Sequence, residues 1–164
     1  MTGRLVRIGT LALSSLLVAA SPSASPSASP SAESLVPSPA AVTVTVFKDP
    51  NCGCCKSWVE HLRKHGFEVI AHDTNDVSAS KRAGRVPQQL YSCHTAFVGG
   101  YVVEGHVPAA DIQRLLRERR KAIGLAVPGM PIGSPGMEGS NRESYSVLLF
   151  DAAGTTVFQR YSAK

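Results

Sequence analysis

Residues 42–55 read VTVTVFKDPNCGCC, a β-branched run followed by three cysteines within four positions. The alternating Val and Thr residues from Val42 to Phe47 predict a β-strand, because branched side chains suit a pleated backbone. Cys52, Cys54 and Cys55 follow where that strand should end. Packing has no need of three thiols in one turn, whereas soft-metal binding and thiol redox chemistry both require sulfurs that converge. The stretch therefore predicts a strand that leads into a metal-binding or redox-active cysteine loop.

Helical and strand patterns alternate after the cysteine loop. Apolar residues recur at helical spacing between Lys56 and His65, and Gly66 ends this segment. The Gly99-Gly100 pair predicts a two-residue hairpin turn between two short strands. The further predicted elements are strands at 67–70, 95–98 and 101–104 and helices at 77–83 and 108–121. The order β-α-β-α-β-β-α is that of an α/β, thioredoxin-like domain, here with an appended C-terminal β-hairpin formed by residues 145–150 and 156–161.

This topology also predicts the position of the fourth cysteine. The loop after the first strand opens a helix, and the start of the third strand lies beside it, so Cys93-His94 should meet the cysteine loop. If the Gly99-Gly100 hairpin pairs Val98 with Tyr101, Cys93 falls opposite His106. The predicted site therefore has His106 at its rim and consists of Cys52, Cys54, Cys55, Cys93 and His94.

A long Gly/Pro-rich segment, about residues 126–142, contains the tripeptide Pro-Gly-Met twice, ending at Met130 and Met137. A loop of this length without secondary structure is uncommon in a compact domain and is often functional. A methionine more often fills a gap in the core. Two copies in one loop instead favour a role as soft ligands, because a thioether suits Cu(I) and serves Zn²⁺ poorly.

The N-terminus has the pattern of an export signal. Arg4 and Arg7 precede an apolar run, Ile8 to Ala20, that ends in small residues and is too short to span a bilayer. We expect a signal peptide at 1–20, a flexible Ser/Pro/Ala-rich linker at 21–40 and the domain at 41–164. The alternative is an uncleaved N-terminal anchor. A cleaved signal predicts a periplasmic protein without stable membrane insertion, in a compartment where paired cysteines often form disulfides.

The formal net charge of +5 gathers partly on the last predicted helix. Its basic residues are Arg114, Arg117, Arg119, Arg120 and Lys121. Apolar Ile112, Leu115 and Leu116 alternate with them at helical spacing, so a solvated helix face explains the charges. Export makes nucleic acid an improbable partner, and we expect none.

Three other interpretations compete for the cysteines. A structural disulfide pair explains an even cysteine count in an exported protein, but it leaves three sulfurs in one turn unexplained. A thioredoxin-like thiol-disulfide oxidoreductase would use Cys52 as nucleophile and Cys55 as resolving thiol. Against it, His94 stands where such enzymes keep a cis-proline. A zinc site of three Cys and one His leaves one cysteine and both methionines without a role.

Several motifs in fixed order resemble the CopG-like family, exported Cys-rich proteins found with copper-resistance systems and formerly a domain of unknown function. The resemblance covers nearly the whole expected mature chain, and its motifs are DPNCGCCK (49–56), SCHTA (92–96), EGHVPA (104–109), GLAVPGMP (124–131) and GSPGME (133–138). It implies a thioredoxin-like fold, copper held by the cysteines and a role in copper tolerance that extends to electron transfer.

We therefore expect a periplasmic copper-binding protein that serves copper resistance. The expected thiolate ligands are Cys52, Cys54, Cys55 and Cys93; His94 is the expected nitrogen ligand, with Met130, Met137 and His106 more peripheral. Four thiolates exceed what one Cu(I) ion prefers, so bridging sulfurs should hold several ions. Copper ions and other periplasmic copper-handling proteins are the expected partners. The residues leave enzymatic activity, as a copper or thiol oxidoreductase, undecided.

Overall fold

The predicted first strand is present as β1 (Thr43–Lys48) in a computed structural model that describes residues 41–163. The predicted signal peptide (1–20) and linker (21–40) lie outside the described residues. The helices of residues 41–163 are α1 (Gly53–Lys64), α2 (Val77–Ala83), the short 3-10 helix η1 (Gln88–Leu90) and α3 (Ala109–Glu118). The other strands are β2 (Glu68–Asp73), β3 (His94–Val98), β4 (Tyr101–Glu104), β5 (Gly124–Ala126), β6 (Tyr145–Asp151) and β7 (Gly154–Tyr161).

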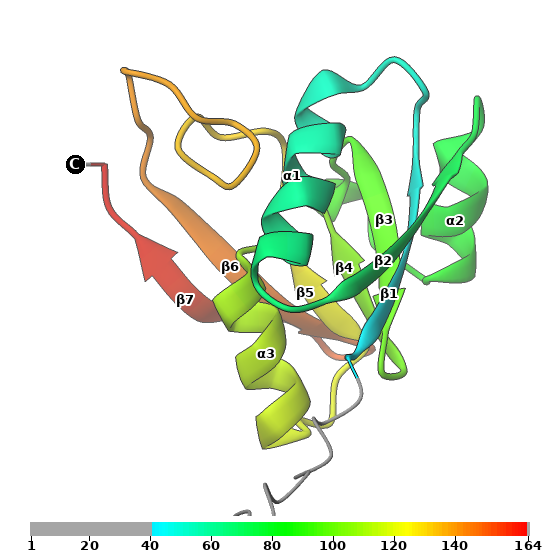
Figure 1. The fold of residues 1–164 in the computed structure, drawn as a ribbon. Coiled ribbons are helices and arrows are strands. Elements are labelled where there is room, and N and C mark those ends of the chain that lie inside the picture. The colour runs from blue at the N-terminus through cyan, green and yellow to red at the C-terminus, as the bar shows by residue number, and fades with distance from the viewer. Residues whose placement is uncertain (1–40, 164) are drawn as a thin grey trace, which may run out of the picture. The chain divides into compact units, whose positions relative to one another are not determined.

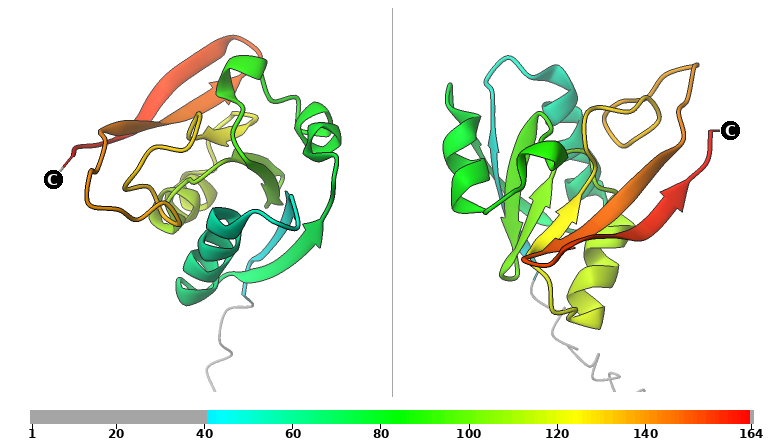
Figure 2. Two further views of the ribbon diagram at one scale, coloured as in Figure 1. Left: turned by 90° about the horizontal axis from the view of Figure 1, so that it is seen from above. Right: turned by 180° about the vertical axis from the view of Figure 1, so that it is seen from behind.

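One mixed sheet joins these strands in the order β2-β1-β3-β4-β5-β6-β7. β1 and β2 pair in parallel, β3 runs antiparallel to β1, and β4 runs antiparallel to β3. Helices α1 and α3 cover one face of the sheet and α2 covers the other, as Figure 1 and Figure 2 show from three sides. This arrangement confirms the predicted α/β, thioredoxin-like fold.

The main core lies between the sheet and the α1–α3 layer. Trp58 of α1 and Ile112 of α3 are fully buried against Val44 and Val46 of β1. The Trp58 Nε1–H group donates a hydrogen bond to the Val107 carbonyl at 2.9 Å, so the one polar atom of this indole is satisfied. The core thus holds the N-terminal half of α1 rigidly against the sheet, and the cysteines lie at that end of the helix.

Helix α1 begins at Gly53, earlier than the apolar periodicity predicted. Cys52 is the N-cap residue, and its Sγ atom accepts a hydrogen bond from the Cys55 N–H group at 3.3 Å. A sulfur cap is weaker than the usual Ser, Thr, Asp or Asn cap, which is why the sequence did not indicate it. As a result, Cys54 and Cys55 lie in the first helical turn.

The C-terminal hairpin, β6 and β7, belongs to the main sheet. The link is β5, a strand that the sequence analysis missed, which pairs with β4 in parallel and with β6 antiparallel. β5 is only three residues long and begins with glycine, so it carries no usable strand pattern. A Cβ atom on Gly124 would lie 1.8 Å from the Val102 carbonyl oxygen, so this close pairing requires glycine.

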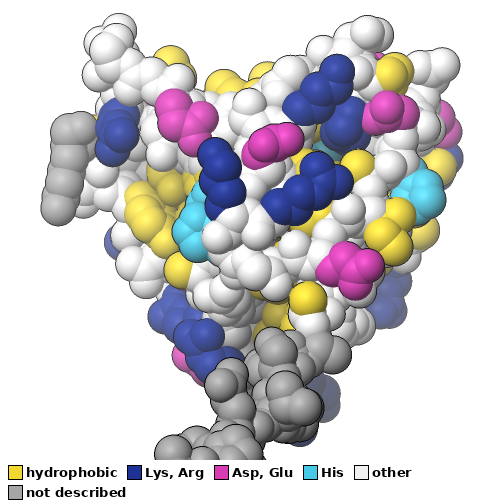
Figure 3. Space-filling view, in the orientation of Figure 1, with side chains coloured by type: hydrophobic (Ala, Val, Ile, Leu, Met, Phe, Trp, Pro, Cys, Tyr) yellow, Lys and Arg dark blue, Asp and Glu magenta, His cyan; other side chains and the backbone are white. Residues whose placement is uncertain are grey.

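The basic residues of the α3 region lie largely in solvent. Arg117, Arg119, Arg120 and Lys121 are exposed, while the Arg114 guanidinium lies 3.8 Å from the centroid of the Phe158 ring. Figure 3 shows Lys and Arg side chains interspersed with acidic ones on the α1–α3 side of the molecule. This agrees with the interpretation of a solvated face. Within residues 41–163, no helix is both long and apolar enough to cross a membrane.

Candidate metal centre

The four cysteines converge at the N-terminal end of α1. Cys52 caps the helix, Cys54 and Cys55 lie in its first turn, and Cys93 directly precedes β3. Their four sulfur atoms all lie within 4.8 Å of one another. The predicted meeting of Cys93 with the cysteine loop is confirmed.

The centre is present in a partly oxidised form. Cys52 and Cys55 are joined by a disulfide, with their Cα atoms 5.3 Å apart, while Cys54 and Cys93 are free. The Cys54 sulfur lies 3.5 Å from the Cys52 sulfur. A disulfide sulfur is not a thiolate, so a four-thiolate metal site requires reduction of this bond. The sequence could not choose between the pairings that four cysteines allow.

His106 is positioned as a nitrogen donor toward Cys93. The β3–β4 hairpin pairs Val98 with Tyr101, as expected, and the His106 Nε2 atom lies 2.9 Å from the Cys93 sulfur. The Nδ1 atom lies 2.7 Å from the Pro135 carbonyl oxygen, which can only accept a hydrogen bond. Nδ1 therefore carries the proton, and Nε2 presents its lone pair to the sulfur. Metal-binding histidines usually have such a carbonyl behind them, which fixes the tautomer.

His94 lies against the same sulfur, with its ring centroid 5.0 Å from that of His106. Its Nδ1 atom lies 3.2 Å from the Cys93 sulfur, and its ring centroid is 4.3 Å from that of Trp58. The His94 Nε2 atom is buried without a hydrogen-bond partner. The geometry thus supports His106 more strongly than His94 as a nitrogen ligand, whereas the sequence had placed His106 at the rim.

Burial decides the protonation states around Cys93. It raises the pKa of the Cys93 thiol to about 12, and the neighbouring Cys54 sulfur adds to the rise. It lowers the pKa of both His94 and His106. At neutral pH both imidazoles are therefore neutral and able to bind a metal, and the Cys93 thiol donates its hydrogen to His106 Nε2. A metal ion bound by Cys93 must displace that proton.

Both Pro-Gly-Met segments border the centre through their backbones. The Gly129 N–H group donates to the Tyr91 carbonyl at 3.1 Å, and the Ser92 hydroxyl donates to the Gly129 carbonyl beside Cys93. The second segment touches the centre through the His106–Pro135 bond. The Met130 side chain is 51% exposed. The backbone of this loop therefore lies against the centre and helps to hold Ser92 and His106 in place. Metal binding by the Met130 or Met137 side chain stays a prediction.

Gly136 packs against the first turn of α1. Because Gly129 occupies the same place in the other Pro-Gly-Met copy, the two glycines give a matched test of the contact between this loop and the centre. A Cβ atom at Gly136 would lie 2.6 Å from the Cys54 carbonyl oxygen, whereas one at Gly129 meets nothing within 4 Å. Both glycines have positive φ angles, +85° and +69°. We expect Gly136→Ala to lower the free energy of unfolding by about 1–3 kcal/mol and to weaken metal binding, because both backbone strain and a clash result. Gly129→Ala controls for the strain alone, and equal losses of metal affinity in the two variants would contradict this role.

A buried ion pair between Lys81 and Glu104 holds the backbone of Ser92, the residue before Cys93. The sequence did not indicate this pair. Glu104 is fully buried, and its Oε1 atom lies 2.5 Å from the Lys81 Nζ atom. The same oxygen accepts the Ser92 N–H group at 2.6 Å, and Oε2 accepts the Thr95 hydroxyl at 2.7 Å. An acidic residue at the end of the apolar β4 strand was the only sequence signal. The pair ties α2 and β4 to the backbone that presents Cys93.

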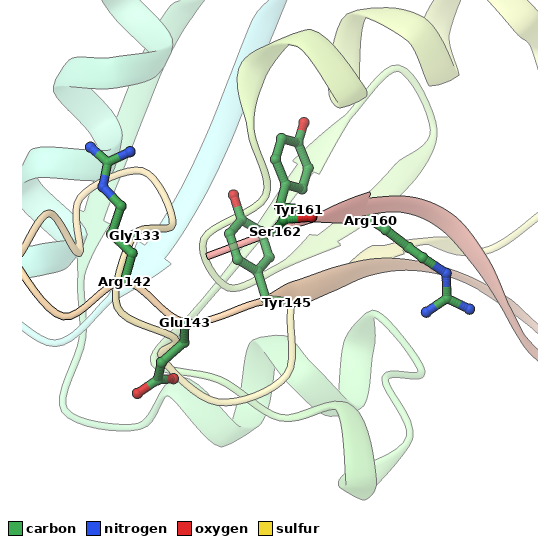
Figure 4. A pocket seen from close by; sticks show the side chains of 7 residues that line it. All are labelled: Gly133, Arg142, Glu143, Tyr145, Arg160, Tyr161 and Ser162. Carbon is green, nitrogen blue, oxygen red and sulfur yellow. The ribbon is translucent and has the colours of Figure 1, made fainter. Parts of the chain in front are cut away.

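A hollow of about 360 Å³ lies beside the C-terminal hairpin (Figure 4). In this view the charged side chains of Arg142, Glu143 and Arg160 point away from one another. The Tyr161 hydroxyl is already engaged, because it donates a hydrogen bond to Asp111 at 2.7 Å. Polar groups that bind a ligand converge on it. The charged side chains around this hollow do not converge in that way, so we assign it no ligand.

Two comparisons with known proteins match the chain. A family described as a protein of unknown function, DUF411, matches residues 90–137, the part that contains Cys93, His94, His106 and both methionines of the loop. Two solved structures described as copper resistance protein copG are similar over the whole domain. Form 2 is 48% identical, with a TM-score of 0.70 over 74% of this chain and 98% of that one. Form 1 is 47% identical, with a TM-score of 0.71 over 75% of this chain and 99% of that one. No curated protein matches.

The protein is a thioredoxin-like domain whose helix N-terminus holds a cysteine cluster with two histidines beside it. At this identity and coverage, the chain belongs to the CopG-like copper-resistance family.

Proposed function

We propose that this protein binds Cu(I) and serves copper resistance. The observation that carries the proposal is the convergence of four cysteine sulfurs within 4.8 Å. Thiolates are soft donors of the kind that Cu(I) prefers. The relatives described as copper resistance proteins support the same metal.

The donor set favours several ions over one. Cys54 and Cys55 are adjacent in the chain, and neighbouring cysteines seldom both fit one tetrahedral ion. Bridging thiolates shared between Cu(I) ions use all four sulfurs, with His106 or His94 completing the coordination. A closed zinc site needs only four donors, and soft thioether ligands suit it poorly. Met130 and Met137 are peripheral ligands in this proposal.

The location and the partners belong to the same proposal. The N-terminal pattern of Arg4, Arg7 and the following apolar run supports export to the periplasm. There the protein would exchange copper with other copper-handling proteins. The Cys52–Cys55 disulfide supports a redox element in this function, since four thiolates become available only after its reduction.

An anaerobic Cu(I) titration of the reduced protein tests the proposal. We expect more than one Cu(I) ion per chain, with thiolate-to-copper absorption, because four thiolates bridge ions. In the same titration, protein with the disulfide intact should bind fewer Cu(I) ions, because the sulfurs of Cys52 and Cys55 are then not thiolates. A single tightly bound zinc ion that excess Cu(I) does not displace would contradict the proposal.

A thiol-disulfide oxidoreductase is the second candidate, and one observation favours it. The Cys52–Cys55 disulfide lies at the N-terminus of a helix, where the helix dipole stabilises a thiolate. Against it, Cys54 and Cys93 crowd the disulfide, and a pure exchange pair has no use for them. The two functions differ in their need for Cys54.

A further inference from the structure

The centre contains two sets of donors that share one atom. The first is the four cysteine sulfurs. The second is the Cys93 sulfur with one ring nitrogen each from His94 and His106, again all within 4.8 Å of one another. Cys93 is the only residue in both sets. We name the second set the Cys93–His94–His106 triad.

The disulfide affects these two sets differently. Bonding Cys52 to Cys55 removes two donors from the four-sulfur set, while every donor of the triad stays free. The triad is also already assembled: the two nitrogens lie 3.2 Å and 2.9 Å from the Cys93 sulfur. Both histidine side chains are fully buried, and the Pro135 carbonyl holds His106 in the tautomer with Nε2 free.

We propose that, in the disulfide form, the Cys93–His94–His106 triad binds one borderline divalent ion of the Zn²⁺ class. This inference rests on the proposed function, because it gives the same centre a second metal state. One thiolate and two imidazoles suit a borderline cation, whereas Cu(I) prefers the softer four-sulfur set. Three protein ligands leave a fourth position open, and the free sulfur of Cys54 lies within 4.8 Å of Cys93. Binding involves no redox step: the Cys93 thiol releases one proton to solvent and the sulfur bonds to the metal.

The consequence is a change of metal preference with the state of one disulfide. With Cys52–Cys55 closed, the centre offers mixed nitrogen and sulfur donors to one divalent ion. With the bond reduced by an external dithiol, which supplies two electrons and two protons, four thiolates become available to Cu(I). Cys93 takes part in both states, so the two metal loads compete.

Cobalt is a suitable probe, because Co²⁺ takes zinc-like sites and its thiolate complexes absorb visible light. The full-length protein is kept oxidised. A count of two reactive thiols per denatured chain shows that one disulfide is present, and peptide mapping of the cross-link verifies that it joins Cys52 to Cys55. Anaerobic titration should show one Co²⁺ per chain with sulfur-to-cobalt absorption, and one Zn²⁺ should displace it. Absence of Co²⁺ binding by this form overturns the inference.

Variants show whether Co²⁺ is bound by the triad or by the sulfurs of Cys52 and Cys55. Cys93→Ser and His106→Gln should each weaken Co²⁺ binding by about tenfold or more. His72→Gln, at an exposed histidine on β2, should change nothing. The double variant Cys52→Ser/Cys55→Ser should bind Co²⁺ as the wild type does, and this arm stands even if a triad variant fails to fold. Loss of Co²⁺ in the double variant, or its retention in both folded triad variants, overturns the inference.

The test also separates this inference from the proposed function. If the reduced wild type takes up several Cu(I) ions but the disulfide form binds no Co²⁺, the inference is wrong and the proposed function stands. If the disulfide form binds Co²⁺ but the reduced form does not take up Cu(I), the proposed function is wrong and the triad stands.

Discussion

Cys54→Ser is expected to abolish most of the Cu(I) binding of the reduced protein. Cys54 lies between the two cysteines of the disulfide, and its sulfur is 3.5 Å from that of Cys52. A sulfur in this place is suited to bridging copper ions, and its loss leaves only three sulfurs, without the one that lies between Cys52 and Cys55 in the chain. We expect the number of bound ions to fall to one or fewer and the affinity to drop by more than about tenfold. Anaerobic titration with a competing Cu(I) chelator measures both.

The same variant distinguishes copper binding from thiol-disulfide exchange. An exchange enzyme needs only Cys52 and Cys55, so Cys54→Ser should leave its turnover of model disulfides intact. We expect slow exchange in the wild type and in the variant. Ser57→Ala, one turn further along α1 and exposed, is the control and should retain full copper binding. Brisk exchange that survives Cys54→Ser, together with unchanged copper uptake, would establish the oxidoreductase instead.

Glu104→Leu should produce the largest loss of stability among single substitutions near the centre. It leaves the Lys81 ammonium buried without its partner, and it removes the acceptor of the Ser92 N–H group. An unpaired buried charge of this kind costs about 3–5 kcal/mol of folding free energy. Chemical denaturation should show this loss as a shift in midpoint with an unchanged slope.

Two further variants test whether the loss of stability is specific to the buried Lys81–Glu104 pair or would follow from breaking any ion pair. Lys81→Met/Glu104→Leu removes both charges and should recover much of the stability, because apolar side chains can replace a buried pair. Its metal affinity, like that of Glu104→Leu, should be lower than that of the wild type, since the Ser92 N–H group beside Cys93 has lost its acceptor. Glu118→Ala breaks the exposed Arg120–Glu118 pair and should cost no more than about 1 kcal/mol. A loss in Glu104→Leu as small as that in Glu118→Ala would contradict the role of this pair.

The sequence predicted the features that rest on local pattern and register. The β-branched run before Cys52 and the Gly99-Gly100 turn fixed two strand positions, and the hairpin register then brought His106 opposite Cys93. This inference needed only the period of a strand. The thioredoxin-like order likewise followed from the alternation of helical and strand patterns.

The features that depend on long-range pairing were missed. Lys81 and Glu104 are 23 residues apart, and neither residue signals a buried partner. Strand β5 exists because Gly124 allows close approach to β4, which is a tertiary contact without a local pattern. The choice of Cys52 and Cys55 as the disulfide pair also depends on three-dimensional placement. For the same reason the sequence could not rank His106 above His94, since the Pro135 carbonyl that orients His106 comes from a distant loop.

X-ray absorption at the copper edge, on the reduced protein loaded anaerobically with Cu(I), tests the central claim most directly. The four sulfurs within 4.8 Å predict a first coordination shell dominated by sulfur, with a second vector from copper to a neighbouring copper ion. The Cys54→Ser variant should lose that copper–copper vector. A shell dominated by nitrogen or oxygen, with a single copper ion and no copper neighbour, would contradict a thiolate-bridged copper centre.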